Sequence, residues 1–288
     1  MTAISLVIST RDRCEKLKLC LRKIRAIDTS LSWQLILVDN GSSDSTPDVL
    51  EEFARLASFP VLVLKEASPG LGRAHNRGWR AATGEIIAFT DDDCYVSPDY
   101  LDRALEAFAD PKVGFCGGRI KLYDISDYPI TINDSATPLI FPPYSYITPG
   151  AIQGANMIFR RRALQDIDGF DDALGPGAQF NCEDIDACAR AAFAGWWGAY
   201  APGPTVLHAH GRKAGDVAAL SRSYAIARGA YAAKFILRPD TRRCYLRSWS
   251  RHLASWSRRP APYRRECFYE IQGAIQYYCR KLFVSKAG

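Results

Sequence analysis

The sequence predicts an α/β fold with a mostly parallel, Rossmann-like sheet flanked by helices, followed by a basic amphipathic helical extension. Short β-rich runs alternate with stretches of helical periodicity over the first 93 residues, as in a doubly wound sheet. From residue 212 onward the chain is strongly basic, and its apolar residues recur at helical spacing. With 288 residues, 48% of them hydrophobic, the chain is long enough to bury a full core without disulfides.

The elements follow from local pattern. Asp44, just before Pro47, is expected to cap a helix. Residues 124–150 hold five prolines and are expected to form a long surface loop. Strands are expected at 4–8, 33–38, 61–64, 85–89 and 205–207, and helices at 14–27, from 44 onward, at 72–83 and at 183–190.

Charge and cysteine usage narrow the class of protein. Residues 212–288 hold 17 of the 37 Lys and Arg and 4 of the 31 Asp and Glu, a net charge of +13, which leaves −7 for residues 1–211. The nine cysteines are odd in number and show neither CxxC nor zinc spacing, so we expect reduced thiols in a cytoplasmic protein. No apolar run reaches the roughly 18 residues of a membrane span, and the first ten residues are typical of a strand rather than of a signal peptide.

Three polar signatures follow expected strands, at residues 10–12, 39–44 and 91–93. Ligands of such sheets bind beyond the carboxyl ends of the strands, so we expect all three to line one crevice. Asp91 and Asp93 would point the same way, and adjacent carboxylates are tolerable when they hold a hard cation. The alternative is a solvated acidic turn. Asp39 could accept the N–H of a pyrimidine ring.

Further candidates are weaker when taken singly. The glycines between Gly70 and Gly78 would let backbone approach a ligand, but they form no Walker loop. Glu183 and Asp184 could supply a general base, or could simply be acids favoured at a helix N-terminus. His208 and His210 could include a metal ligand, or could be incidental.

In this order and spacing, the motifs resemble the family 2 glycosyltransferases of the GT-A fold. The resemblance covers residues 3–211. The matching segments are residues 7–11, 38–44, 70–78, 90–94, 154–156, 169–171, 182–186 with Arg190, and 206–208.

The resemblance implies a role for each matched residue. Asp184 would be the catalytic base, with Glu183 as its neighbour. Asp93 and Asp91 would hold Mn²⁺ or Mg²⁺, with His208 or His210 as a further ligand. Asp92 lies between the two acids of the motif, so the metal-binding pair could shift by one. The nucleotide-sugar would be bound by Thr10, Arg11, Asp39, Arg73, Asn76, Asp91 and Asp92.

The resulting expectation is a metal-dependent inverting glycosyltransferase. It would move a sugar, with UDP as the expected carrier, to a hydroxyl of a saccharide, lipid-linked or protein acceptor in polysaccharide or glycolipid biosynthesis. One alternative is a nucleotidyltransferase on a similar sheet, which would need a Gly-rich basic loop that residues 9–13 do not offer. Another is a non-catalytic scaffold or nucleic-acid-binding protein that uses the basic region, although the acidic body disfavours nucleic acid.

The expected division is a catalytic domain at 1–211, with a nucleotide-binding half (1–93) and an acceptor half (94–211), and a helical region at 212–288. We expect the apolar faces of this region to pack on the catalytic domain or on a second subunit of a homo-oligomer. The alternative is attachment to an anionic surface on the cytoplasmic face of a membrane. The two apolar patterns are Tyr245, Trp249, Leu253 and Trp256, and Phe268, Ile271, Ile275, Tyr278 and Leu282.

Overall fold

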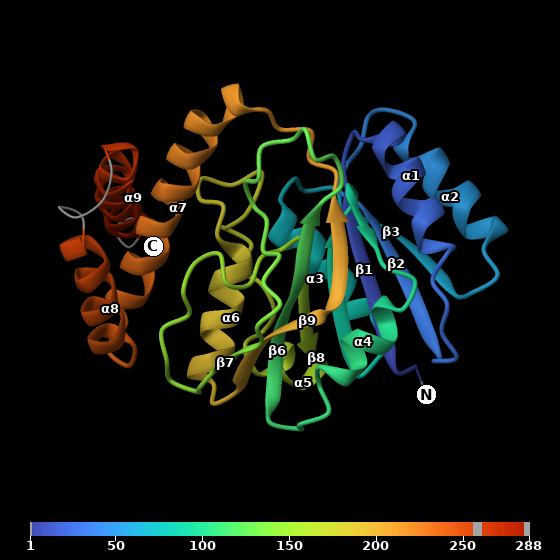
Figure 1. Ribbon diagram of the computed structural model, residues 1–288, viewed down its shortest axis with the longest axis horizontal. Coiled ribbons are helices and arrows are strands. Elements are labelled where there is room, and N and C mark those ends of the chain that lie inside the picture. Colours follow the sequence, from blue (N-terminus) through green and yellow to red (C-terminus); the bar gives the residue numbers. More distant parts are fainter. Residues whose placement is uncertain (1, 256–260, 285–288) are drawn as a thin grey trace.

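The computed structural model describes residues 2–255 and 261–284, in which a mixed sheet lies between two layers of helices (Figure 1). The predicted α/β class is confirmed. The first half is parallel, with strand order β3-β2-β1-β4. Its elements are β1 (Ile4–Thr10), α1 (Cys14–Ile24), β2 (Trp33–Asp39), α2 (Thr46–Leu56), β3 (Val61–Lys65), α3 (Leu71–Ala81) and β4 (Ile86–Asp91).

The second half continues the same sheet with mixed strand directions. β8 runs antiparallel to both β4 and β6, whereas β9 is parallel to β6 and pairs antiparallel with β5 and β7. The sheet is therefore continuous across residue 93. The elements are β5 (Cys94–Val96), α4 (Tyr100–Glu106), β6 (Val113–Leu122), β7 (Leu139–Phe141), β8 (Asn156–Arg160), α5 (Arg161–Asp166), α6 (Glu183–Phe193) and β9 (Trp197–His208).

Both faces of the sheet are buried. On β1, Val7 joins one apolar core, and Leu6 and Ile8 join the other, because successive side chains point to opposite faces. The first core includes residues of α3, α5 and α6, and the second includes residues of α1, α2 and α4. Two helical layers therefore hold the strand ends rigidly in place.

Three helices follow the sheet, namely α7 (Val217–Ile236), α8 (Arg242–Ala254) and α9 (Ala261–Val284), after a short 3₁₀ turn η1 (Ala214–Asp216). α7 lies beside α6, and α8 and α9 lie on its outer side (Figure 1). Tyr231 of α7 and Tyr245 of α8 are both buried, with their hydroxyl oxygens 2.7 Å apart. The predicted helical extension is confirmed, and α7 contributes residues to the first apolar core, the one that includes α3, α5 and α6.

For the second predicted apolar pattern, packing on the catalytic domain is wrong, whereas packing on a second subunit stays a prediction. The second predicted apolar pattern, which begins at Phe268, is exposed, whereas the opposite face of α9 packs against α7. A Cβ on Gly273 would lie 1.9 Å from the carbonyl oxygen of Ile226, and one on Gly229 would lie 1.8 Å from that of Glu270. Glycine at both positions lets the two backbones touch, and this contact selects the buried face. Trp256 of the first predicted pattern lies outside the described residues.

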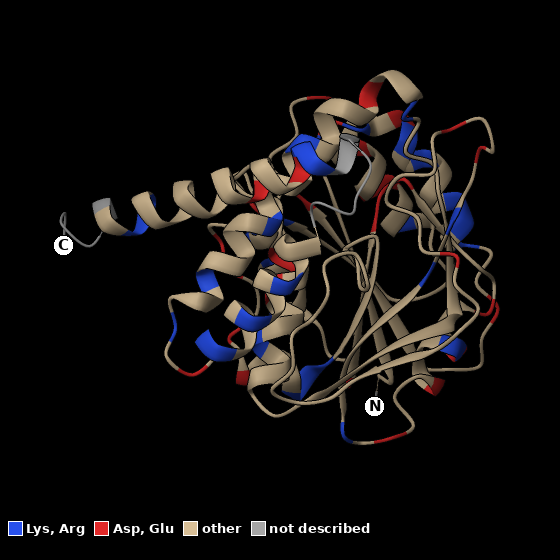
Figure 2. Ribbon diagram, turned by 60° about the vertical axis from the view of Figure 1, so that its left-hand side comes forward, with Lys and Arg blue, Asp and Glu red and all other residues tan. Residues whose placement is uncertain are grey.

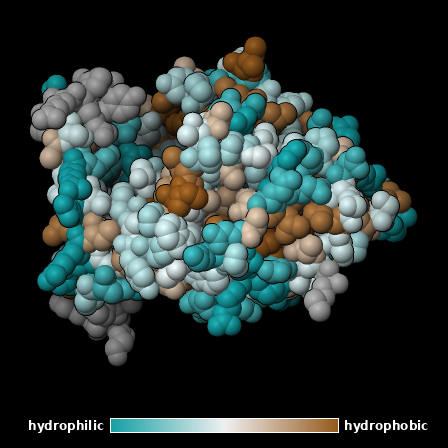
Figure 3. Space-filling model, turned by 60° about the horizontal axis from the view of Figure 1, so that its bottom comes forward, coloured by the Kyte–Doolittle hydropathy of each residue, from teal (hydrophilic) through white to brown (hydrophobic). Residues whose placement is uncertain are grey.

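Two further expectations can be compared with the structure. All nine cysteines are free thiols, as their spacing predicts. Among the described residues, no helix combines the length and the apolar character that crossing a bilayer requires. On the face that Figure 3 shows, hydrophobic side chains form small separate spots between hydrophilic ones.

Candidate functional site

The carboxyl ends of the parallel strands meet as their order predicts. Thr10 at the end of β1 pairs with Asp39 at the end of β2, and Ser9 pairs with Asp91 at the end of β4. The hydroxyl of Thr10 donates a hydrogen bond of 2.6 Å to Asp92. Three segments far apart in the sequence therefore share one edge of the sheet.

Potential metal ligands gather at this edge. Ligand atoms of Asp91, Asp93, Cys94 and His208 all lie within 4.8 Å of one another, because β5 pairs Cys94 with His208 on β9. Nε2 of His208 lies 3.4 Å from a carboxylate oxygen of Asp93. Burial raises the pKa of Cys94 well above its ordinary value. Its sulfur is also a soft donor, which suits a hard cation less well than carboxylate oxygen does. Two carboxylates and an imidazole remain, a set that fits Mn²⁺ or Mg²⁺.

Arg13 holds the acidic turn together. Its Nε lies 3.1 Å from Asp92, and its guanidinium also contacts Asp93. Burial opposes ionisation of Asp93, but His208 and Arg13 lower its pKa overall. Burial raises the pKa of Asp92 to about 6, and Arg13 limits this rise. Asp92 is therefore the acid that accepts the hydroxyl of Thr10, whereas Asp91 and Asp93 belong to the group of potential metal ligands.

The two histidines have different surroundings. Nδ1 of His210 accepts the backbone N–H of Arg212 at 3.0 Å and lies 3.6 Å from Asp127. The rings of His208 and His210 meet edge to face, 4.9 Å apart. Of the two, His208 is the one that contributes to the cluster with Asp91 and Asp93.

The second acidic pair begins α6. One carboxylate oxygen of Asp184 accepts the N–H of Gly154 at 2.9 Å, and the other accepts the N–H of Ile185 at 2.7 Å. Burial raises the pKa of Asp184, and these two hydrogen bonds limit the rise. Glu183 is buried against Gly175, where a Cβ would lie 2.9 Å from its carboxylate. Burial raises the pKa of Glu183 well above its ordinary value.

A pocket of about 530 Å³ joins the two acidic groups. Asp91 and His208 line it beside Asp184, and Tyr224 of α7 and Arg212 complete the wall. Arg212 donates hydrogen bonds of 3.2 Å to the hydroxyls of Tyr224 and Thr131. Sequence reasoning missed Arg212 and Tyr224, because a helical pattern does not say which cleft the helix covers. The only local signal was that Arg212 follows His210 by two residues.

The remaining expected donor residues lie around this edge. Asp39 is buried and accepts the N–H of Ser42 at 2.9 Å. Arg11 is half-exposed and lies 3.6 Å from Asp12. Arg73 is also half-exposed, lies 3.4 Å from Asp172, and is not part of the pocket wall.

Asn76 departs from its expected place at the nucleotide-sugar. It donates to Asp172 at 2.7 Å and to the carbonyl of Phe170 at 2.8 Å, and its oxygen accepts N–H groups of Trp79 and Phe170. Its amide is therefore fully used in holding residues 170–172 against α3. The glycine-rich segment resembled a ligand loop, but at Asn76 the requirement is internal packing.

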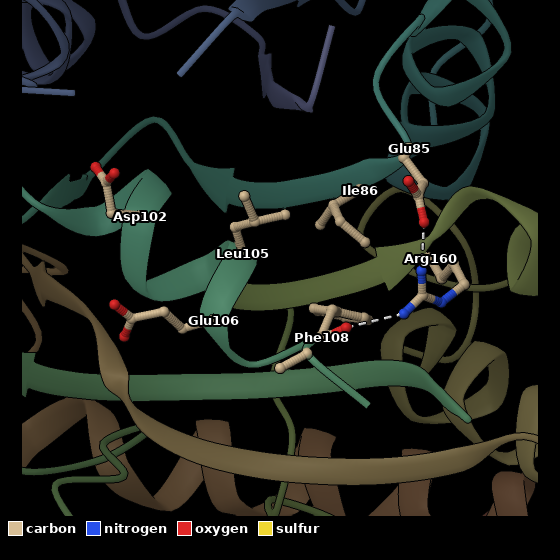
Figure 4. Close-up of a pocket in the computed structure, with 8 residues that line it drawn as sticks. Glu85, Ile86, Asp102, Leu105, Glu106, Phe108 and Arg160 are labelled. Carbon is tan, nitrogen blue, oxygen red and sulfur yellow. Dashed lines mark hydrogen bonds and ion pairs between the residues drawn. The ribbon is translucent and has the colours of Figure 1, made fainter. Parts of the chain in front are cut away.

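A second pocket of about 490 Å³ lies at the start of β4, away from Asp91 (Figure 4). Asp102 and Glu106 of α4 line it, together with Glu85. Its one arginine, Arg160, is bound to Glu85 and to the carbonyl of Phe108 (Figure 4). This acidic pocket has no free cation for a phosphate and lies at the wrong end of the strands.

Comparison with known proteins agrees with the geometry. A sequence model described as "Glycosyl transferase family 2" matches residues 5–168. The pre-mycofactocin glycosyltransferase of Mycobacterium tuberculosis is 25% identical over 243 residues, which are 82% of this chain and 48% of that protein. Across four of the curated relatives, the chain spans 31–62% of the length of the relative.

Solved structures extend the likeness through the C-terminal helices. The mannosyltransferase PcManGT from Pyrobaculum calidifontis, in complex with GDP-Man and Mn²⁺, has a TM-score of 0.68 at 20% identity, covering 96% of this chain and 86% of that one. TarS 1–349 of S. aureus, in complex with UDP-GlcNAc, has a TM-score of 0.62 at 15% identity, covering 96% and 81%. At these identities the likeness shows a shared fold, the GT-A fold expected from the sequence.

Proposed function

The chain belongs to glycosyl transferase family 2, and on this premise we propose that it transfers a sugar from a nucleoside diphosphate to an acceptor hydroxyl with inversion. The observation that carries the proposal is the shared pocket, in which Asp184 faces the same space as Asp91 and His208. These two residues form a cluster of potential metal ligands with Asp93. The acceptor hydroxyl would belong to a saccharide, a lipid-linked sugar or a protein. Nine free cysteines support a reducing compartment, the cytoplasm.

Asp91, Asp93 and His208 would hold the divalent cation, with Mn²⁺ and Mg²⁺ as the candidates. When bound, such a cation neutralises the diphosphate and stabilises the leaving nucleoside diphosphate. Arg13 keeps the carboxylate of Asp93 ionised and oriented. Arg212 presents a guanidinium that donates to the hydroxyls of Thr131 and Tyr224, which leaves its charge able to contact a phosphate.

Asp184 would act as the general base. Its two backbone hydrogen bonds fix the carboxylate, and its burial makes it a stronger proton acceptor than an exposed aspartate. It would take the proton of the acceptor hydroxyl as that oxygen attacks the anomeric carbon from the face opposite the diphosphate. Holding the two reactants side by side supplies much of the remaining acceleration.

The nucleoside would lie over the ends of β1 and β2. Asp39 can accept the ring N–H of uracil through its second carboxylate oxygen, and Thr10 and Arg11 lie on the adjacent strand end. This favours a UDP-sugar as the donor. The solved relatives bind GDP-Man in one case and UDP-GlcNAc in another, so the carrier has to be tested directly.

Thermal unfolding with UDP, GDP and TDP, each with and without Mn²⁺, tests the donor site. A ligand at 100 times its dissociation constant stabilises a protein by about 2.7 kcal/mol, enough to raise the midpoint by several degrees. We expect a Mn²⁺-dependent rise with UDP that is absent in Asp93→Asn and retained in Asp168→Asn, whose side chain is exposed.

Other outcomes would change the proposal in defined ways. A rise with GDP or TDP alone would keep the enzyme class and change the carrier. A rise with nucleoside triphosphates instead would favour a nucleotidyltransferase. No rise with any nucleotide, with the fold intact, would favour a non-catalytic scaffold.

A further inference from the structure

The outer side of α9 carries an apolar stripe, which we define as Phe268, Ile271, Ile275, Tyr278 and Leu282. The exposed fractions of these residues lie between 44% and 68%. Their spacing of three and four residues places them on one side of the helix over four turns. The packing against α7 through Gly273 uses the opposite face. Within the described residues, the stripe is therefore exposed on a different face of α9 from the one that packs against α7.

Basic residues outnumber acidic ones on these outer helices. The described residues of α8 and α9 include eight Lys and Arg and two glutamates, Glu266 and Glu270. Both glutamates form ion pairs with Arg228 of α7, which faces the inner side of α9, at 2.7 and 2.8 Å. Arg265 and Lys281 of α9 are exposed. The exposed charges of Arg265 and Lys281 are thus basic, and both glutamates of α9 are paired with Arg228.

The helix is placed so that a flat surface can reach it. α8 and α9 lie on the far side of α7 from the sheet (Figure 1), and α9 projects from the body of the molecule (Figure 2). Tyr277, on the inner face, contacts Phe180 with ring centroids 5.9 Å apart, so the helix is anchored while its outer face stays open.

We propose that the apolar stripe of α9 and the basic residues beside it dock the protein on an anionic lipid surface. An interfacial helix buries its apolar side at the boundary between headgroups and acyl chains, with basic residues near the phosphates. A second copy of the chain is the rival occupant, since the spacing also suits a coiled coil. Self-pairing would bring two basic faces together with no unpaired acid on α9 to offset them, and this favours the anionic lipid.

Vesicle co-sedimentation tests the proposal without nucleotide or acceptor. Full-length protein should bind vesicles of equal parts phosphatidylglycerol and phosphatidylcholine at least about tenfold more strongly than pure phosphatidylcholine vesicles, and added salt should weaken the binding. Ile275→Glu should reduce binding at least about tenfold, because it places a charge in the apolar stripe. The double change Arg265→Gln and Lys281→Gln should also reduce binding about tenfold or more.

Matched controls separate docking from folding. Leu56→Glu on α2 alters a side chain that is 53% exposed, against 58% for Ile275, and should leave binding unchanged. Arg22→Gln with Lys23→Gln on α1 is the control for charge. Ile275→Glu should keep the thermal midpoint and the response to UDP and Mn²⁺, so failure of docking and failure of the proposed enzyme activity are distinguishable.

Two results would overturn the proposal. One is equal binding of wild type and Ile275→Glu to the anionic vesicles. The other is a wild-type dimer in light scattering that Ile275→Glu dissociates, together with no vesicle binding by either protein, which would assign the stripe to a second copy.

Discussion

Asp184 is a buried carboxylate whose two oxygens are each fixed by one backbone N–H. Burial raises its pKa above the ordinary 3.8, and a general base must be ionised to work. kcat/KM should therefore rise with pH through this raised value, so the acid limb of the profile lies above that of an exposed aspartate. Asp184→Asn should lower kcat by about 10²–10⁴ and abolish this limb, while nucleotide binding is kept. A variant that loses nucleotide binding instead would place Asp184 at the donor.

Arg13, which lies between β1 and α1, places a cation beside the acidic turn at residues 91–93. It contacts Asp92 and Asp93 together, so Arg13→Ala removes the arginine charge from two buried carboxylates and leaves them with Thr10 and His208. In the absence of metal we expect a loss of about 1–3 kcal/mol in the free energy of unfolding. Mn²⁺ should recover more stability in this variant than in wild type, because it restores positive charge beside the same carboxylates.

Arg13→Lys is the control for that experiment. It keeps the charge and should lose less stability than Arg13→Ala in the absence of metal. Equal losses in the two variants, with no extra gain from Mn²⁺, would mean that Arg13 acts by packing alone. Thermal unfolding with a chelator measures the loss of stability without metal, and the same experiment with Mn²⁺ measures the gain on metal binding.

At the scale of single elements, the contact of α7 with α9 depends on two glycines. In Gly273→Ala the added methyl would lie 1.9 Å from the carbonyl oxygen of Ile226, so the helices must separate. We expect a loss of about 1–3 kcal/mol in the free energy of unfolding, as for other overpacked interiors. Gly215→Ala, at a position with open space around it, is the matched control and should change little. Chemical denaturation measures both.

Glu270 ties all three C-terminal helices together. It accepts from Arg228 of α7 at 2.8 Å and from Trp249 of α8 at 3.1 Å, and it lies 3.1 Å from His252. Burial opposes ionisation, but His252 and Arg228 lower its pKa below the ordinary 4.5. A depressed pKa stabilises the fold above about pH 4.5, and this contribution is lost as the pH falls through the folded value.

Glu270→Gln should therefore be less stable than wild type at neutral pH, by about 1–3 kcal/mol. The difference should shrink as the pH falls below 4.5, because wild type then loses the same charge. Urea denaturation at several pH values measures this difference. A gap that stays constant with pH would contradict the assigned role of the charge.

The sequence predicted the elements wherever local pattern decides. β1, β2 and β4 begin within one residue of their expected starts, because each is a short run dominated by apolar residues. β9 was expected as residues 205–207 only, since two glycines and two prolines, at 198, 202, 203 and 204, hide the first two thirds of a 12-residue strand. The face on which α9 packs was also hidden. Helical periodicity identifies an apolar stripe, but the close approach allowed by Gly229 and Gly273 decides which side is buried.

In the candidate site, too, local pattern predicted some features and tertiary contacts decided the others. Strand ends placed Thr10, Asp39 and Asp91 at one edge, because parallel strands end together. The pairing of Cys94 with His208, the bridge from Arg13 and the wall formed by Arg212 and Tyr224 depend on tertiary contacts between segments distant in sequence. No local pattern encodes those contacts. Asn76 is the opposite case: it lies in a segment that resembles a ligand loop, but its side chain makes only hydrogen bonds that hold the fold together.

For the molecule as a whole, the question is whether residues 1–211 form an independent unit. Tyr231 and Phe235 of α7 and Tyr245 of α8 belong to the same buried core as Phe180 and Ile185. Each fully buried aromatic side chain contributes about 1.5–3 kcal/mol, and domains of this kind have only about 5–15 kcal/mol of net stability. Removing the helices would therefore cost a large share of that stability and would also remove one wall of the pocket.

Polar contacts add to this dependence. Nζ of Lys234 on α7 lies 2.6 Å from buried Asp186 and 2.7 Å from Asp171. Truncation therefore removes one of two cations that contact Asp186, the other being Arg190 at 2.8 Å. A chain ending at residue 211 should unfold at a much lower denaturant concentration than the full chain, or fail to fold, and should not respond to UDP with Mn²⁺. A full chain that unfolds in one transition, followed by circular dichroism and tryptophan fluorescence together, fits this interdependence. A truncated chain with native stability and full nucleotide response would instead make residues 1–211 a domain in their own right.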